Sequence, residues 1–175
     1  MKNLKSFILL LIISVFLISC GTSHNYTNNT LNKNFFETKT IYFKLNPNSQ
    51  NVINFSGMVG SVFGGITQPN VKETFKLSIE ELAAETNVKL KFIEYNDEIK
   101  TTNPDIIDVN ISEINWHFGF SVATLKTVVN YKNLYDNNEI KTTGIRKSGG
   151  GDEMNNLKKS LKDATYKFLK ELEKK

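Results

Sequence analysis

The chain has 175 residues, a length typical of one domain, and 39% of them are hydrophobic, which is enough to build a single core. Its formal net charge is +4 at pH 7, and two of the positive charges, Lys2 and Lys5, precede an apolar run near the N-terminus. Without that leader, 4 − 2 leaves +2. Such a small excess excludes the dense basic surface of a nucleic-acid-binding domain, so we expect no nucleic-acid partner.

Residues 1–19 have the pattern of a secretory signal peptide. A basic start, MKNLKS, is followed by the 13-residue apolar stretch FILLLIISVFLIS. At about 1.5 Å per residue, a helix of that length is shorter than the roughly 30 Å hydrocarbon core of a bilayer. The stretch is therefore too short for a permanent membrane span and is typical of a secretory leader.

The leader ends in Leu17-Ile18-Ser19-Cys20, and Cys20 is the only cysteine of the chain. This ending resembles the lipobox of bacterial lipoproteins, which has Leu, a small or aliphatic residue, a small residue and then Cys. The resemblance implies cleavage between Ser19 and Cys20 and a diacylglycerol on the Cys20 sulfur. Two or three acyl chains, at about 0.8 kcal/mol per buried methylene, hold a protein on a bilayer essentially permanently. The alternative is a stray or buried thiol at the end of an uncleaved anchor.

Residues 20–38 are polar and Asn-rich and have no hydrophobic periodicity, which predicts a lipidated N-terminus followed by a flexible tether. Neither Gly21 nor Thr22, the two residues after Cys20, is the aspartate that in enteric bacteria is associated with inner-membrane retention. No acidic residue occurs before Glu37. By this analogy we expect the outer membrane, with a single domain at 39–175 facing the periplasm.

An apolar, glycine-rich piece, INFSGMVGSVFGGI, occupies residues 53–66, after a short β-prone run at 41–45. One interpretation is a segment that touches the membrane or drives oligomerisation, because glycine lets apolar backbones approach closely. The other, which we favour, is a mobile loop folded against the domain or a connection where one backbone crosses another. The candidate partner-facing loop consists of Phe55, Met58, Val59, Val62 and Phe63.

Two amphipathic helices are predicted, at about 71–86 and about 152–173, with Asn70 and Asp152 as their N-caps. The lysines of the second helix, Lys162 among them, are expected on a solvated basic face while the apolar stripe packs on a sheet. A free helix of this kind could instead lie on anionic lipid. The Gly-Gly-Gly-Asp sequence before it is interpreted as a hinge, because the acidic residues that follow would repel a phosphate group.

Three segments alternate apolar and polar residues and are joined by turn sequences: 106–116, 121–133 and 139–147. Short links of this kind join antiparallel neighbours. In the first segment the alternation slips between Ile111 and Ile114, as a β-bulge would produce. With further strands at 41–45 and 88–95, the chain predicts an α+β fold with an antiparallel sheet of about four to five strands and both helices packed on one face.

The sequence contains no recognisable catalytic constellation. His24 falls in the expected tether and His117 in a predicted tight turn, and neither has neighbours that would make it a metal ligand or a general base. Nucleophile-elbow, HExxH and SxxK motifs are missing from the sequence. We therefore expect a protein that binds rather than catalyses, with no metal and no other cofactor.

The order strand, helix, strand, meander, helix is similar to that of small envelope lipoproteins of the YajG-like kind. The resemblance covers roughly residues 71–173 and rests on VNISEINW, VATLKTVVNY and NNLKKSLKDATYKFLKEL. It implies a membrane-tethered α/β domain, in a group whose members are mostly uncharacterised. The leading hypothesis is an accessory protein that docks on a larger envelope assembly through its sheet edge or the 55–66 loop. The alternatives are a carrier or sensor of a small apolar ligand held between sheet and helices, and a hydrolase with an unrecognised site.

Overall fold

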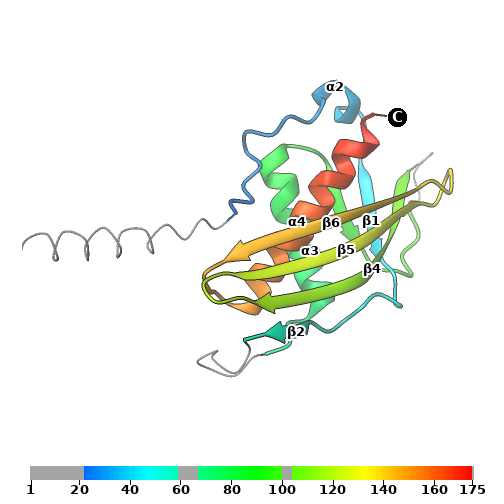
Figure 1. Cartoon of the computed structure of the whole chain (residues 1–175). Coiled ribbons are helices and arrows are strands. Elements are labelled where there is room, and N and C mark those ends of the chain that lie inside the picture. Colours follow the sequence, from blue (N-terminus) through cyan, green and yellow to red (C-terminus); the bar gives the residue numbers. More distant parts are fainter. Residues whose placement is uncertain (1–21, 59–66, 100–103, 175) are drawn as a thin grey trace, which may run out of the picture.

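The structure, a computed structural model, describes residues 22–58, 67–99 and 104–174 (Figure 1). Six strands form one sheet: β1 (Ile41–Leu45), β2 (Asn54–Gly57), β3 (Leu90–Ile93), β4 (Asp105–Phe118), β5 (Ala123–Asn133) and β6 (Glu139–Ser148). Their order is β3-β1-β4-β5-β6, and β2 pairs with β4 beyond the end of β1. The long strand β4 is therefore the centre of the sheet.

The meander predicted from alternation is confirmed, because β4, β5 and β6 pair in antiparallel fashion. The predicted bulge is confirmed as well, since the β4–β5 register shifts between Ile111 and Glu113. The rest of the sheet differs from the predicted antiparallel arrangement, because β1 runs parallel to β3 and β4, and β2 runs parallel to β4. Parallel neighbours need long connections, and helix α3 supplies one between β1 and β3. The sheet is thus mixed, within the expected α+β class.

Helices α3 (Val71–Thr86) and α4 (Glu153–Leu172) pack on one face of the sheet (Figure 1). Both predicted N-caps are confirmed: the Asn70 side chain accepts a hydrogen bond from the backbone N–H of Glu73, and Asp152 accepts one from Asn155. Capping groups of this kind satisfy N–H groups that the first helical turn leaves without partners. None of the helices within the described ranges combines the length and apolar character needed to cross a membrane.

Aromatic rings fill the space between the sheet and the two helices. Phe43 of β1 packs edge-on against Phe75 of α3 and Phe168 of α4, with ring centroids 6.4 and 6.1 Å apart. Tyr131 of β5 stacks on Phe168 at 4.4 Å. All four side chains are fully buried. The layer where an apolar ligand was considered is therefore occupied by core side chains.

The segment 22–38, predicted as a flexible tether, instead packs along the domain. Leu31 and Phe36 are buried in the core, and a short helix, α2 (Lys33–Phe36), covers the region near the C-terminal end of α4 (Figure 1). The polar side chains that suggested a tether instead contact the domain: both His24 and Tyr26 have Asp163 as a partner. The ordered domain thus includes residues 22–38, whereas the predicted signal peptide at 1–19 and the Cys20 position lie outside the described residues.

Candidate functional site

Aromatic side chains gather at the end of the sheet where β2 and β4 stop. We call this group, Phe55, Met58, Trp116, Phe118 and Phe120, the aromatic end. Parallel pairing of β2 with β4 sets Phe55 beside Trp116. The Trp116 and Phe118 rings stack with centroids 4.9 Å apart, and Phe55 lies 6.0 Å from Trp116 and 6.3 Å from Phe118. Contacts of this kind between rings stabilise an aromatic cluster beyond simple area burial.

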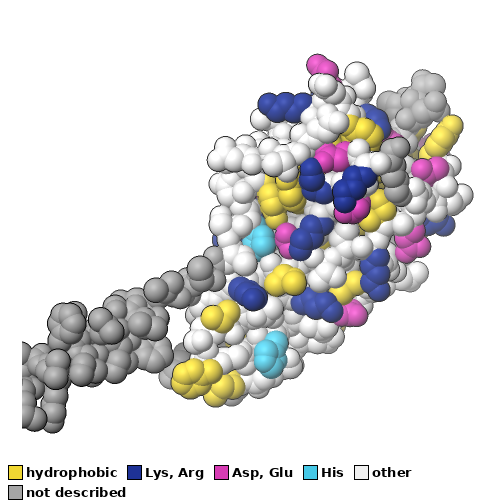
Figure 2. Space-filling view, turned by 45° about the horizontal axis from the view of Figure 1, so that its top comes forward, with side chains coloured by type: hydrophobic (Ala, Val, Ile, Leu, Met, Phe, Trp, Pro, Cys, Tyr) yellow, Lys and Arg dark blue, Asp and Glu magenta, His cyan; other side chains and the backbone are white. Residues whose placement is uncertain are grey.

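The aromatic end continues from the core out to the protein surface. Trp116 is only 3% exposed, whereas Met58 is 51% exposed and Phe120, in the connection between β4 and β5, is 90% exposed. The space-filling view shows hydrophobic side chains gathered at this same end of the molecule (Figure 2). An exposed phenylalanine next to further apolar side chains is the kind of patch that marks a contact with another surface.

Gly57 lets β2 lie against the end of β4. Its φ is +83°, and a Cβ atom at this position would lie 2.3 Å from the carbonyl oxygen of Phe118. At this glycine β2 pairs with β4 in parallel and does not cross it, so only a close backbone approach is observed, and residues 59–66 of the glycine-rich piece lie outside the described residues. His117, predicted in a tight turn, instead belongs to strand β4, and its Nδ1 lies 3.1 Å from the Ser56 hydroxyl. The turn lies after His117, at residues 119–122, where the N–H of Gly119 donates to the carbonyl of Val122.

The structure brings together only part of the predicted partner-facing loop. Phe55 and Met58 belong to the aromatic end, while Val59, Val62 and Phe63 lie outside the described residues, as do Ser19 and Cys20. Sequence reasoning missed the association of Phe55 with Trp116. Residues 55 and 116 are far apart in the chain, and no local pattern announces a parallel pairing over four residues.

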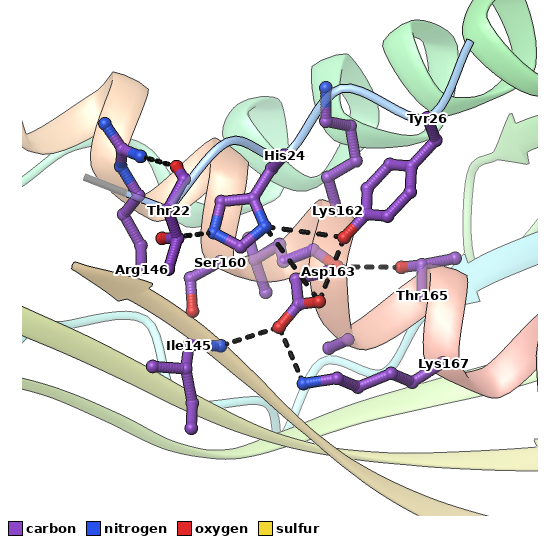
Figure 3. A network of polar contacts seen from close by, with 12 residues as sticks. Thr22, His24, Tyr26, Ile145, Arg146, Ser160, Lys162, Asp163, Thr165 and Lys167 are labelled. Atoms are coloured by element: carbon purple, nitrogen blue, oxygen red, sulfur yellow. Dashed lines mark hydrogen bonds and ion pairs between the residues drawn. The ribbon is translucent and has the colours of Figure 1, made fainter. Parts of the chain in front are cut away.

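A second group of side chains fixes the start of the described chain to strand β6. The backbone N–H of Thr22 donates to the Lys147 carbonyl at 3.2 Å, and the Lys147 N–H donates to the Thr22 hydroxyl at 3.1 Å. The Arg146 guanidinium donates to the Thr22 carbonyl. We call Thr22, His24 and Tyr26, with the groups that bind them, the N-terminal clamp (Figure 3).

Asp163 of α4 is the centre of the clamp (Figure 3). One of its carboxylate oxygens accepts a hydrogen bond from the Tyr26 hydroxyl at 2.9 Å, and the other accepts from the backbone N–H of Ile145 at 2.9 Å. The Tyr26 ring stacks on Tyr166 with centroids 4.0 Å apart. Burial, together with the nearby Asp163 carboxylate, raises the pKa of Tyr26, so its hydroxyl stays protonated and remains a donor.

Lys162, predicted on a solvated basic face, is instead 1% exposed. Its ammonium lies 2.5 Å from Glu81 and 2.7 Å from Glu85, two carboxylates of helix α3. Burial opposes ionisation of Glu81, but the ammonium groups of Lys158 and Lys162 outweigh it and lower the pKa of Glu81. The prediction was wrong because helical periodicity does not reveal that the neighbouring helix presents acidic groups at this height.

His24 of the clamp and Ser160 nearby on α4 carry groups of the kind used in catalysis, but each has a structural partner of its own. Ser160 of α4 shares a hydrogen bond with Thr127 at 3.0 Å, so its hydroxyl is directed into the sheet. The nearest partner of the His24 ring is the Thr22 hydroxyl, at 2.9 Å, and its other nitrogen lies 3.9 Å from Asp163. Groups of three or more side chains suited to hold a metal ion do not occur in the described ranges. The contacts of His24 and Tyr26 hold the N-terminal segment against helix α4.

Acidification should loosen the N-terminal clamp. Burial lowers the pKa of His24 below its usual value of about 6.5; Asp163 opposes this shift, whereas Arg146 and Lys162 contribute to it. As pH falls below the unfolded value, a released segment gains a proton that the clamped histidine does not. The clamp is therefore expected to be stable at neutral pH and to lose stability progressively below about pH 6.5.

Hydrogen exchange of the backbone amides at residues 22–31, corrected for the intrinsic effect of pH, measures this loosening. We expect protection to fall between about pH 7.5 and pH 5.5 in the natural chain, and to become insensitive to pH in a His24→Gln variant. The matched control is His117→Gln, which leaves the pH dependence intact. Equal pH dependence in all three chains would assign the effect to other groups.

Two surface hollows lie at opposite ends of α3. One, of about 480 Å³, is lined by residues that include Leu45, Val71 and Tyr95. The other, of about 570 Å³, is lined by α2 and the end of α3 and includes Leu31 and Phe36. Both lie outside the layer between sheet and helices, so a bound ligand would occupy the rim of the fold rather than its core.

Comparisons with known proteins find likeness of structure alone. No protein-family model matches the chain, and no curated protein does. A crystal structure of an uncharacterised protein aligns with a TM-score of 0.41 and 6% identity over 78% of this chain and 90% of that one. A PelC dodecamer from Paraburkholderia phytofirmans aligns with a TM-score of 0.36 and 3% identity over 73% of this chain and 84% of that one. A hypothetical protein from Chlamydia trachomatis aligns with a TM-score of 0.36 and 10% identity over 77% of this chain and 94% of that one. At such scores and identities the likeness carries no inference about function.

Proposed function

We propose that this chain is a lipid-anchored protein of the bacterial envelope that acts by binding, as an accessory component of a larger assembly. The observation that carries the proposal is the ending Leu17-Ile18-Ser19-Cys20 of a short apolar leader, with the single cysteine of the chain in the place that lipidation requires. In this proposal the acyl chains on Cys20 hold the domain on the periplasmic face of the outer membrane, by the analogy drawn from the residues that follow Cys20.

The N-terminal clamp changes how such an anchor acts. Because Thr22 is fixed to β6, a lipidated Cys20 holds the folded domain directly on the bilayer, without a long tether. The domain then has little freedom to rise or rotate. An anchored protein of this kind presents a defined set of surfaces to its partner.

Docking through the free edge of β6 is not favoured by the structure. Asp163 accepts the Ile145 N–H, the ammonium of Lys167 donates to the Thr143 carbonyl at 2.8 Å, and Thr22 covers Lys147. These contacts use the backbone groups that an added strand would need. The polar face of the sheet, opposite the helices, remains for a partner in the proposed assembly.

Lipidation at Cys20 is tested by expressing the full chain in a Gram-negative host with a palmitate analogue that can be labelled. We expect label in the mature chain, a mass that starts at acylated Cys20, and a membrane fraction that resists washing with salt and alkali. Cys20→Ser is expected to lose all three, and Ser19→Ala, which keeps a small residue before the cysteine, is expected to lose none. An unmodified thiol in a mature chain that washes off membranes would overturn the proposal.

A carrier of a small apolar ligand is the second candidate function, and the 570 Å³ hollow beside Leu31 and Phe36 favours it. The two functions differ in what purifies with the protein. A specific protein complex recovered from envelope extracts supports the accessory role, whereas the chain alone with bound lipid supports the carrier. Asn34→Trp, a bulky substitution at an exposed position that lines this hollow, should reduce lipid recovery in the second case while leaving a protein complex assembled through other surfaces.

A further inference from the structure

We infer that the aromatic end enters the surface of the same bilayer that holds the Cys20 anchor, with Phe120 as the side chain that inserts. This inference rests on the proposed function, because it requires the acylated cysteine. It assigns the aromatic end to lipid rather than to a protein partner, and it gives the domain two contacts with the membrane, one covalent and one apolar.

The position of the anchor follows from the N-terminal clamp. Thr22 lies beside Lys147 on the edge of β6, joined to it by two hydrogen bonds. Cys20 precedes Thr22 by two residues. Because each residue spans at most about 3.6 Å, the two Cα atoms lie within about 7 Å of each other in any conformation. The acyl chains therefore start close to the end of β6.

The aromatic end lies on the same rim of the sheet. In the register, Phe118 of β4 pairs with Ala123 of β5, and Ala123 pairs with Ser148 of β6, next to Lys147. Strands are spaced about 4.8 Å apart, so about 14 Å separates Phe118 from Thr22. In Figure 1, β2, β4 and β6 all end on the side where the described chain begins. A membrane that holds the anchor thus meets this rim first.

The chemistry of the rim suits a bilayer surface. Phe120 is 90% exposed at the tip, with Met58 and the partly buried rings of Phe55 and Phe118 behind it. Transfer of aromatic and thioether side chains from water to the boundary between headgroups and acyl chains is favourable, because it removes apolar surface from water. Lys147 is exposed near this rim, but the exposed Asp152 follows within a few residues. Insertion is therefore expected to depend on apolar contact and not on anionic lipid.

Tyr135 provides a matched reference at the opposite end of the molecule. It is 74% exposed in the connection between β5 and β6. The length of β5, 11 residues at about 3.3 Å each, places this turn roughly 35 Å from the aromatic end. A probe at position 135 is thus largely exposed, like one at 120, but lies far from the proposed membrane surface.

The test uses the full lipidated chain in vesicles of zwitterionic phosphatidylcholine that carry bromine on their acyl chains. Trp116 is the only tryptophan, so Trp116→Phe supplies a background without tryptophan fluorescence. Phe120→Trp and Tyr135→Trp are then compared in that background. We expect blue-shifted emission and loss of fluorescence to bromolipid at 120, unchanged emission at 135, and the same result when anionic lipid is added. If Trp116→Phe unfolds the chain, Phe120→Trp and Tyr135→Trp are made with Trp116 retained. The quenching of each variant is then compared with that of the natural chain, and the increase reports the added tryptophan.

Each outcome decides between the proposals, because the mass of Cys20 is measured on the same sample. Acylated Cys20 with no quenching at 120 overturns this inference and leaves the proposed function standing. Equal quenching at 120 and 135 overturns the orientation. A blue shift at 120 that depends on protein concentration and appears without bromolipid quenching assigns the aromatic end to a second copy of the chain. Unmodified Cys20 overturns both proposals.

Discussion

Replacing Lys162 with methionine is expected to lower the free energy of unfolding by about 3 kcal/mol. The ammonium of Lys162 is buried between the carboxylates of Glu81 and Glu85, and it joins α4 to α3. Methionine keeps most of the side-chain volume but leaves the partly buried Glu85 without its cation, whereas Glu81 keeps its ion pair with Lys158. Urea unfolding followed by circular dichroism measures the change.

Two further variants isolate the cause of the Lys162 effect. Lys174→Met, just beyond the end of α4, removes an ammonium from an exposed pair with Glu171, and we expect a loss below about 0.5 kcal/mol. Adding Glu85→Gln to Lys162→Met removes the carboxylate that lost its cation and should restore part of the stability. If the double variant is no more stable than Lys162→Met, lost packing and not uncompensated charge explains the effect.

Gly144→Ala is expected to destabilise the fold by about 3 kcal/mol or to prevent folding. Gly144 lies in β6 where α4 crosses closest, and a Cβ atom there would stand 1.9 Å from the Ser160 carbonyl oxygen. Because the obstacle is backbone, no change of side-chain rotamer relieves it, and α4 must move away from the sheet. Thermal unfolding of the full chain reports the loss.

The controls for Gly144 separate steric contact from strand propensity. Lys141→Ala, an exposed position of the same strand, should change stability by no more than about 0.5 kcal/mol. Ser160→Gly added to Gly144→Ala should not restore stability, because the obstructing oxygen remains. Recovery in that double variant would show that the Ser160 side chain, rather than the helix backbone, limits the approach.

Local periodicity predicted the elements whose structure is decided by near neighbours. The alternation in β4 and β5 and the cap residues Asn70 and Asp152 involve contacts within a few residues or across short turns, so each left a readable pattern. The two helices were predictable for the same reason, because their apolar residues recur at helical spacing within each segment. These are also the elements that define the α+β class.

Long-range pairing accounts for what the sequence did not reveal. Strand β2 has only four residues, and its place beside β4 depends on the close backbone approach that Gly57 permits. The buried ion pair of Lys162 depends on Glu81, which is 81 residues away in the chain. Likewise, the polar segment around Tyr26 looks unstructured until its contact with Asp163 is known. The candidate site at the aromatic end belongs to this long-range class, which is why only Phe55 and Met58 were anticipated.

The closed edge of β6 has a consequence for crowding. In the proposed lipid-anchored state, molecules confined to one bilayer plane meet side by side at high local concentration, the condition under which bare strand edges fuse into continuous intermolecular sheets. Here the carboxylate of Asp163 and the ammonium of Lys167 already occupy the backbone positions that such growth would require. Dense packing on a membrane therefore need not lead to fibrils, and lateral neighbours can remain separate molecules.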